Sequence, residues 1–401
     1  MMTAHRAARD GAPSLLPTRS LLVGFVGVVA LAGLGGVAAC GDDAPVDPST
    51  AACDGATLLP RPADPAARGP WPVGARTVAV GRLGKVEVWY PATPGSEVGL
   101  PPARYDIRQA LNPMQRATIP DADNPWQPCD CVRDLPLDEA HGPYPAVVFV
   151  HGTAGFRHQT LHQATHWASR GFVVVAADHP GLVLGDLLAL FCPDTTTGRR
   201  DLDGDVVLLT EALAAPAGEL AFLAGHVDGD RLAVAGHSAG AGTAASASSL
   251  RGVRAVISLA GNQPAVDAPA LEQVLFMSGE RDALVPPAQV RTAWEGSATP
   301  RYLVSVANAG HLAFSDLCAT TNADGQNLLQ VSQEYGICGV DMAGMLFDCA
   351  ADQLAPATGW AIIDHASTAV LERALQCRAD AAPLAAIEEA YPDVAVYAEA
   401  P

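Results

Sequence analysis

The sequence predicts an α/β fold in which a mostly parallel central sheet carries helices on both faces. Short continuous apolar runs, typical of buried parallel strands, alternate with longer segments of helical pattern. Of the 401 residues, 49% are hydrophobic and 17% are charged, which fits a globular core and excludes a disordered or coiled-coil protein. The strand-like runs span residues 146–150, 172–177, 232–235, 255–259, 274–277 and 302–306, and the helical segments span 203–224 and 239–250.

The two ends of the folded part are also indicated by pattern. Residues 76–80 and 85–90 alternate apolar and polar side chains around a glycine turn, which predicts an antiparallel hairpin. Residues 357–378 have the pattern of a closing helix. We therefore expect one folded domain over residues 71–380 and a mobile, alanine-rich tail over residues 381–401.

The chain is strongly acidic. It has 24 Lys and Arg residues against 43 Asp and Glu residues, a formal charge of −19. A negative surface of this kind offers no electrostatic attraction to the phosphates of nucleic acids or to anionic lipid headgroups. Nucleic acid is therefore not an expected partner.

Residues 1–39 predict an export signal. A leader with three arginines precedes the uncharged stretch 21–39, which ends in the tetrapeptide VAAC, whose last residue is Cys40. This ending resembles the bacterial lipobox, in which small residues precede a cysteine that is lipidated and becomes the mature N-terminus. We expect an exported lipoprotein anchored through Cys40, periplasmic or at the cell surface, with residues 40–70 as a disordered tether. A plain signal anchor is the alternative.

The cysteine count supports an exported protein. If Cys40 carries lipid, eight of the nine cysteines remain, an even number in an oxidising compartment where disulfides persist. We expect disulfides, but eight cysteines allow 105 pairings and the sequence selects none of them. A zinc site at Cys129-Asp130-Cys131 is weaker, because one intervening residue is tighter than a zinc knuckle and no second pair follows. The eight are Cys53, Cys129, Cys131, Cys192, Cys318, Cys338, Cys349 and Cys377.

The strongest chemical signal is Gly-His-Ser-Ala-Gly at residues 236–240. It directly follows a strand-like run and opens a helix of small residues. A nucleophile on a sharp strand-to-helix turn needs small neighbours, because the backbone there is strained and closely packed. We predict that Ser238 is the nucleophile, in an elbow made by Gly236, His237 and Gly240.

A serine hydroxyl becomes a strong nucleophile when a base takes its proton and a carboxylate orients that base. In folds with this elbow, the acid and then the base follow the serine, each after a later strand. Asp282 follows one strand-like run and is the predicted acid; Glu280 and Asp267 are its rivals. His311 follows the next run and is the predicted base.

Acyl transfer also requires backbone N–H groups that stabilise a developing oxyanion. One is expected from Ala239, the residue after the nucleophile at the positive end of a helix. The second is expected from Thr153, which follows the His-Gly pair after the strand-like run 146–150.

Taken together, these segments resemble the α/β-hydrolase superfamily. Within it, the chain is most similar to bacterial exported hydrolases of the platelet-activating-factor acetylhydrolase type, with dienelactone-hydrolase-like and cutinase-like polyester hydrolases as cousins. A dienelactone hydrolase would carry cysteine where this chain has Ser238. The segments that carry the resemblance are VEVWYPA (86–92), AVVFVHG (146–152), SRGFVVVAADHPG (169–181), GHSAG (236–240), SGERDALVPP (278–287) and GHLAFSD (310–316).

The resemblance implies a serine esterase, a carboxylic ester hydrolase, that works through an acyl-serine intermediate without cofactor or metal. The implied substrates are small-molecule or polymeric esters: short-chain acyl esters, phospholipid-type esters or polyesters. The implied protein is monomeric, and its lipid anchor is its contact with the membrane. A peptidase or other acyl hydrolase with the same triad is one alternative. A catalytically silent binding lipoprotein on a hydrolase scaffold is another.

Two clusters of polar residues resemble metal sites but lack ligands that such sites require. His158, His162 and His166 repeat every four residues, as zinc-binding pairs do, but no acidic third ligand is evident. We expect them to form a polar helix face near the mouth of the active site. The aspartates at 201, 203 and 205 imitate a calcium loop but lack its glycine and its final glutamate. The resemblance instead implies that Arg200 and Asp203 form a buried pair.

Residues 312–357 follow the predicted base directly and contain three cysteines with few periodic runs. An insertion at this point can cover an acyl pocket. We expect a disulfide-stiffened cap there.

Overall fold

The computed structural model describes residues 53–193, 197–350, 352–378 and 384–401. The chain divides into two units, residues 1–45 and 46–401, and the fold below is that of the second unit. Cys40 and the predicted export signal lie outside the described residues. Within the described ranges, no helix combines the length and the hydrophobicity that a membrane span requires.

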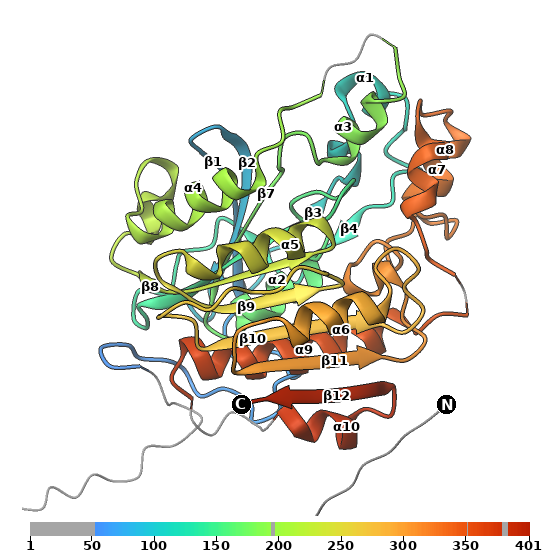
Figure 1. Ribbon diagram of the computed structural model, residues 1–401. Helices are drawn as coiled ribbons and strands as arrows, with labels where there is room; N and C mark the ends of the chain where they lie inside the picture. Colours follow the sequence, from blue (N-terminus) through green and yellow to red (C-terminus); the bar gives the residue numbers. More distant parts are fainter. Residues whose placement is uncertain (1–52, 194–196, 351, 379–383) are drawn as a thin grey trace, which may run out of the picture. The chain divides into compact units, whose positions relative to one another are not determined.

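A ten-stranded sheet forms the centre of this unit (Figure 1). Its strand order is β12-β11-β10-β9-β8-β6-β7-β2-β1-β5, and the six strands from β11 to β7 run parallel to one another. All six predicted strand-like runs are in this parallel block. The strands of the sheet are β1 (Val73–Val80), β2 (Leu83–Pro91), β5 (Val132–Arg133), β6 (Tyr144–Val150), β7 (Val173–Ala177), β8 (Val227–His237), β9 (Val253–Leu259), β10 (Gln273–Gly279), β11 (Arg301–Val306) and β12 (Val394–Ala400).

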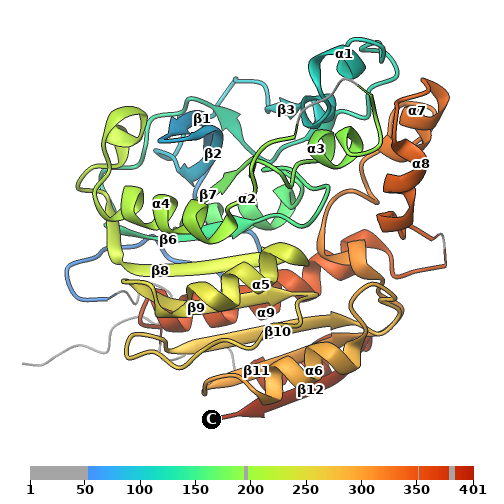
Figure 2. The same ribbon diagram turned by 45° about the horizontal axis from the view of Figure 1, so that its top comes forward.

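Helices cover both faces of the sheet, as the sequence predicts. In Figure 2, α5 and α6 lie on one face and α9 on the other. The main helices are α2 (Leu161–Ser169), α3 (Leu184–Ala189), α4 (Leu202–Ala214), α5 (Ala239–Ser246), α6 (Pro287–Glu295), α7 (Leu328–Glu334), α8 (Val340–Ala343), α9 (Pro356–Leu375) and α10 (Ile387–Ala390), with a short α1 (Pro113–Arg116).

Alternate side chains of the buried strands pack into two different hydrophobic cores, one on each face of the sheet. Val147 and Phe149 of β6 pack into the cluster shared with α2 and α9. Their neighbours Val148 and Val150 point into the cluster shared with α4, α5 and α6. Because successive strand residues face opposite sides, an uninterrupted apolar run is what a strand buried on both faces requires.

The predicted N-terminal hairpin is confirmed. β1 pairs antiparallel with β2, and β2 pairs antiparallel with β7, so the hairpin extends the parallel block at one edge. The connection from β2 to β6 contains η2 (Ile107–Ala110), α1, β5 and a separate two-stranded pairing of β3 (Arg104–Tyr105) with β4 (Gln127–Pro128).

Two predictions about the ends of the domain are wrong. The C-terminal residues are not a mobile tail, because β12 pairs antiparallel with β11 and Ile387 of α10 is fully buried. The part of the expected tether from residue 53 onward is also folded. The buried guanidinium of Arg170 accounts for this packing, since it donates to the backbone carbonyls of Pro62, Asp64 and Ala67.

The prediction of disulfides is confirmed for all eight cysteines. Cys53 pairs with Cys377 and thereby joins the first described residue to the end of α9. The other pairs are Cys129–Cys131, Cys192–Cys338 and Cys318–Cys349.

Candidate active site

Ser238 lies at the sharp turn between β8 and α5. Its backbone has φ +56° and ψ −118°, a left-handed conformation that side-chain-bearing residues rarely adopt. Strain of this kind persists when the surrounding structure enforces it, and it is concentrated at functional sites. The local structure is therefore the elbow that the sequence predicts.

The glycines on either side of the serine are required by close backbone approach. A Cβ atom on Gly236 would lie 2.2 Å from the carbonyl oxygen of Gly240. A Cβ atom on Gly240 would lie 2.1 Å from the carbonyl oxygen of Val150. The turn can approach the end of β6 this closely because both positions lack a side chain.

His311 and Asp282 are brought together from two neighbouring loops. Asp282 follows β10, His311 follows β11 at the start of η5 (His311–Phe314), and His311 Nδ1 lies 2.8 Å from Asp282 Oδ2. The other carboxylate oxygen accepts the backbone N–H groups of Leu284 and Val285, both at 2.8 Å. Both partners are buried, so Asp282 is held in one orientation by three hydrogen bonds.

Neither of the two rival acids contacts His311. Glu280 is exposed and accepts the hydroxyl of Ser305, and Asp267 is exposed in the segment that precedes β10. The geometry therefore favours Asp282 over both.

The first turn of the loop after β6 leaves the amide of Thr153 uncommitted. The N–H of Gly152 donates to Gln159 Oε1 at 3.3 Å, and the N–H of Ala154 donates to the carbonyl of Leu182 at 2.9 Å. The N–H of Gly155 donates to the carbonyl of Gly152 at 3.0 Å. Within residues 152–155, Thr153 is the one whose N–H has no protein acceptor. On the other side of Ser238, Ala239 is the first residue of α5, where helical amides lack an intrahelical acceptor.

His151 determines which way the Thr153 amide points. Its Nδ1 lies 2.8 Å from the Gly152 carbonyl oxygen, which also accepts from Gly155. The Gly152–Thr153 peptide is trans, so its N–H points opposite to its carbonyl group. Holding the carbonyl on one side therefore turns the Thr153 N–H to the other side, away from His151.

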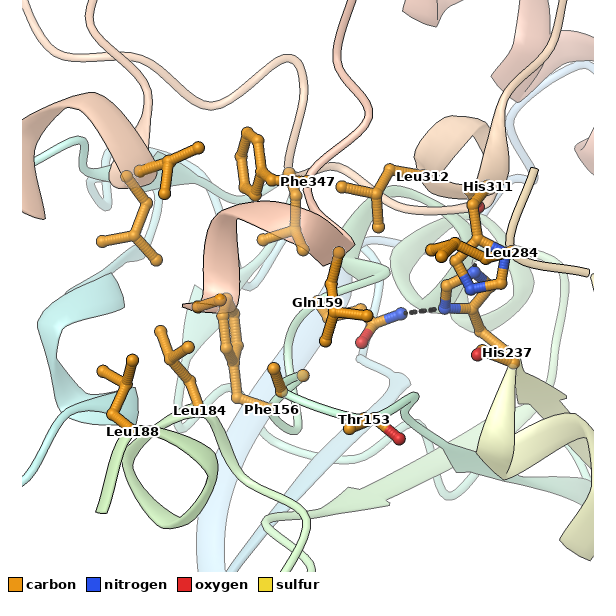
Figure 3. Close-up of a pocket in the computed structure, with 18 of the residues that line it drawn as sticks. Thr153, Phe156, Gln159, Leu184, Leu188, His237, Leu284, His311, Leu312 and Phe347 are labelled. Atoms are coloured by element: carbon orange, nitrogen blue, oxygen red, sulfur yellow. Dashed lines mark hydrogen bonds between the residues drawn. The ribbon is translucent and has the colours of Figure 1, made fainter. Parts of the chain in front are cut away.

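His237 and Gln159 link this loop to the predicted base. Gln159 Nε2 donates to His237 Nδ1 at 2.8 Å, and His237 Nε2 donates to the backbone carbonyl of His311 at 3.0 Å (Figure 3). Burial, and then the neighbouring His311, hold the pKa of His237 well below its usual value. His237 is therefore a neutral ring between Gln159 and the loop that carries His311. Neither His151 nor Gln159 was a predicted site residue, and no local signal around Gln159 indicates its contact with His237.

A largely apolar cavity of about 310 Å³ opens beside Ser238 and His311. Figure 3 shows the cavity extending from His237 and His311 toward Leu184 and Leu188 of α3. Much of its wall comes from the segment after His311, with Leu312, Leu317, Leu328, Leu329, Val340, Leu346 and Phe347 among the lining residues. This segment covers the cavity as expected of the cap, and two disulfides, Cys318–Cys349 and Cys192–Cys338, restrain it.

Two comparisons with known proteins bear on this geometry. The model of the family described as platelet-activating factor acetylhydrolase, isoform II, matches residues 65–181. A ferulic acid esterase from Streptomyces cinnamoneus has a similar structure, with a TM-score of 0.56 and 22% sequence identity over 84% of this chain and 98% of that one. The chain has the α/β-hydrolase fold. No curated protein sequence matches it.

The family match covers one part of this fold. Residues 65–181 include β1 to β7 and the loop with Thr153, but they end before Ser238, Asp282 and His311. These three residues follow β8, β10 and β11, the order that the α/β-hydrolase fold requires of nucleophile, acid and base.

One predicted ion pair is wrong. Arg200 and Asp203 are exposed rather than a buried pair. Asp205 is the buried acid, because it, and not Asp203, lies on the side of α4 that faces the sheet. Its carboxylate lies 2.9 Å from His179 Nδ1 and 2.5 Å from Arg82.

The three spaced histidines do not form a face at the mouth of the active site. His162 Nε2 lies 2.8 Å from Asp364, and His166 Nε2 lies 3.0 Å from Thr368. Both partners belong to α9, and His158 is fully buried. His162 and His166 thus link α2 to α9, whereas His158 lies before α2 and its Nδ1 is 2.8 Å from Gln127 Oε1.

Proposed function

We propose that this protein is a serine esterase, a hydrolase of carboxylic esters. Ser238 is the nucleophile, His311 the general base and Asp282 the acid that orients it. The observation that carries the proposal is the strained Ser238 elbow, which lines the same cavity as His311, the partner of Asp282. The acetylhydrolase family match and the esterase neighbour support the same chemistry.

The hydrogen bonds of His311 determine the path of the proton that leaves Ser238. With Nδ1–H donating to Asp282, Nε2 is free to accept the Ser238 proton as the oxygen attacks the ester carbonyl carbon. The N–H groups of Thr153 and Ala239 stabilise the oxyanion that develops. His311 then gives the proton to the departing alkoxide, which leaves an acyl-serine. Next, His311 takes a proton from water and the resulting hydroxide attacks the acyl carbon. The bond to Ser238 Oγ breaks, His311 returns the proton to that oxygen, and the carboxylic acid is released.

The cavity favours an aliphatic acyl group. Its lining is dominated by leucine, valine and phenylalanine side chains, and the gain from burying apolar surface is not directional. We assign the acyl chain to this cavity and the alcohol portion to the open side of Ser238.

Covalent labelling tests the proposal. A fluorophosphonate probe and a series of p-nitrophenyl esters should react with the wild-type protein and not with Ser238→Ala. Ser249→Ala is the matched control, because Ser249 is an exposed serine just beyond α5. If wild type and Ser238→Ala are labelled equally, the enzyme assignment is lost.

We further propose that the protein is an exported lipoprotein anchored through Cys40. The VAAC sequence and the uncharged run before it support this. In a bacterial host fed a labelled fatty acid, the wild-type protein should incorporate label and sediment with membranes, whereas Cys40→Ser should do neither. Equal labelling of both would overturn the assignment.

A further inference from the structure

The chain returns from the cap to α9 across both catalytic loops. We define the return arm as residues 348–350 and 352–354. The backbone N–H groups of His311 and Leu312 both donate to the carboxylate of Asp348, the latter at 2.9 Å. The N–H of Leu354 donates to the carbonyl of Asn308, at 2.9 Å.

The same arm contacts the loop of the predicted acid. Asp352 lies 2.9 Å from Arg281, the residue next to Asp282, and its backbone carbonyl accepts from the same guanidinium at 3.0 Å. The arm is thus attached to the acid loop through Asp352 and to the base loop through Asp348.

The protein is shaped locally to admit the Asp348 carboxylate. A Cβ atom on Gly310 would lie 2.3 Å from Asp348 Oδ2, so the residue before His311 must be glycine for this contact to form. Asp348 is followed by Cys349, whose disulfide to Cys318 closes the cap into a covalent loop. Cys318 itself lies shortly after η5, the element that His311 begins. The disulfide therefore limits how far Asp348 can move from the His311 backbone.

We propose that Asp348 is a positioning residue for His311, and that the Cys318–Cys349 disulfide keeps it in place. The cap then has a second role besides lining the acyl cavity: it fixes the backbone from which the base projects. A carboxylate that accepts two consecutive backbone N–H groups resists rotation of that segment. This inference rests on the proposed role of His311 as the general base.

Substitutions at Asp348 test the inference. Asp348 does not line the cavity, so Asp348→Ala should lower kcat by at least about tenfold, as misplacement of a catalytic group does, with KM within about twofold of wild type. Asp348→Asn should be intermediate, because its amide oxygen can accept one of the two N–H groups while its NH₂ group opposes the other. Asp341→Ala, an exposed acid in α8, is the matched control and should be unchanged.

Removal of the Cys318–Cys349 disulfide tests the inference independently of substitutions at Asp348. Cys318→Ser/Cys349→Ser should lower kcat in the wild-type background and add little to the loss in the Asp348→Ala background, because both changes release the same contact. Cys129→Ser/Cys131→Ser controls for removal of a disulfide elsewhere. Near-ultraviolet circular dichroism should show that each variant is folded.

The outcomes separate this inference from the proposed function. If wild type hydrolyses esters and Asp348→Ala and Asp348→Asn both keep wild-type kcat, the positioning role is overturned and the esterase assignment stands. Additive losses in the combined variant would overturn the link to the disulfide. If wild type has no serine-dependent activity, the proposed function fails first.

Discussion

The backbone N–H of His179 donates to Nε2 of His151 at 3.2 Å, and this contact determines which nitrogen of His151 carries a proton. An amide N–H can only donate, so Nε2 accepts and the proton is on Nδ1. Burial lowers the pKa of His151 to about 3, which keeps the ring neutral. His151 Nδ1–H is thus available to hold the Gly152 carbonyl, and with it the direction of the Thr153 N–H.

Removing this contact should impair transition-state stabilisation. His151→Phe keeps a planar ring but cannot donate to Gly152, so the Gly155 N–H alone still holds the Gly152 carbonyl and the Gly152–Thr153 peptide is less firmly oriented. We expect kcat to fall toward the roughly 10²- to 10³-fold loss that accompanies removal of one oxyanion donor, with little change in KM. His151→Asn, whose side-chain amide can donate to the same carbonyl, should recover part of the loss. Steady-state kinetics in which the two variants are equally impaired would contradict the mechanism.

The Asp282 carboxylate should be essential to turnover. Asp282→Asn replaces a charged acceptor with an amide and removes the preference for the His311 tautomer that leaves Nε2 free. A decrease in kcat of about 10⁴-fold is expected, by analogy with the serine proteases. Glu280→Gln and Asp267→Asn serve as controls and should each stay near wild type. If Glu280→Gln gave the larger loss, the acid would be misassigned.

The cavity should set acyl chain preference. Each methylene buried in it contributes up to about 0.8 kcal/mol, or roughly fourfold in kcat/KM, until the cavity is full. Leu188, at the end of the cavity far from His311, can be enlarged to block that end (Figure 3). Leu188→Trp should move the optimum of a p-nitrophenyl ester series to shorter chains.

Leu190→Trp is the matched control for this prediction, since Leu190 is 66% exposed and does not line the cavity. Equal chain-length profiles for wild type and Leu188→Trp would exclude the cavity as the acyl site.

Asp316 should make stability fall with rising pH. Burial raises its pKa to about 6, above the ordinary value of an unfolded aspartate, although its Oδ2 accepts from the backbone N–H of His162 at 2.8 Å. The folded state therefore binds more protons than the unfolded state between about pH 4 and pH 6, and the free energy of unfolding decreases through that window. The loss approaches about 3 kcal/mol above pH 6.

Denaturant titrations at several pH values measure this effect. Asp316→Asn cannot ionise, so the difference in unfolding free energy between wild type and variant should change between pH 4 and pH 6 and be constant outside that window. Asp324→Asn, an exposed acid in the same cap, should run parallel to wild type. A difference that does not vary with pH would show that Asp316 is not the titrating group.

Features with a local signature were predictable from the sequence. The apolar runs indicate strands buried on both faces, since successive residues of each run pack into cores on opposite sides of the sheet. The residues around Ser238 indicate an elbow because the strain of the turn and its two close backbone contacts restrict what can stand there. The chain order of Ser238, Asp282 and His311 was recognisable for the same reason, because each follows a strand.

The tertiary structure decided what depends on contacts between distant segments. It selects Asp282 over Glu280 by distance to His311, pairs the cysteines, and makes Asp205 the buried acid in place of Asp203. It also turns the expected tail into the edge strand β12, whose alternating residues gain their partner only when β11 is beside them. Asp348 is the clearest case, since it lies 37 residues from His311 and no local pattern marks it. Such contacts depend on where the chain returns after folding, which the spacing of residues along the sequence does not encode.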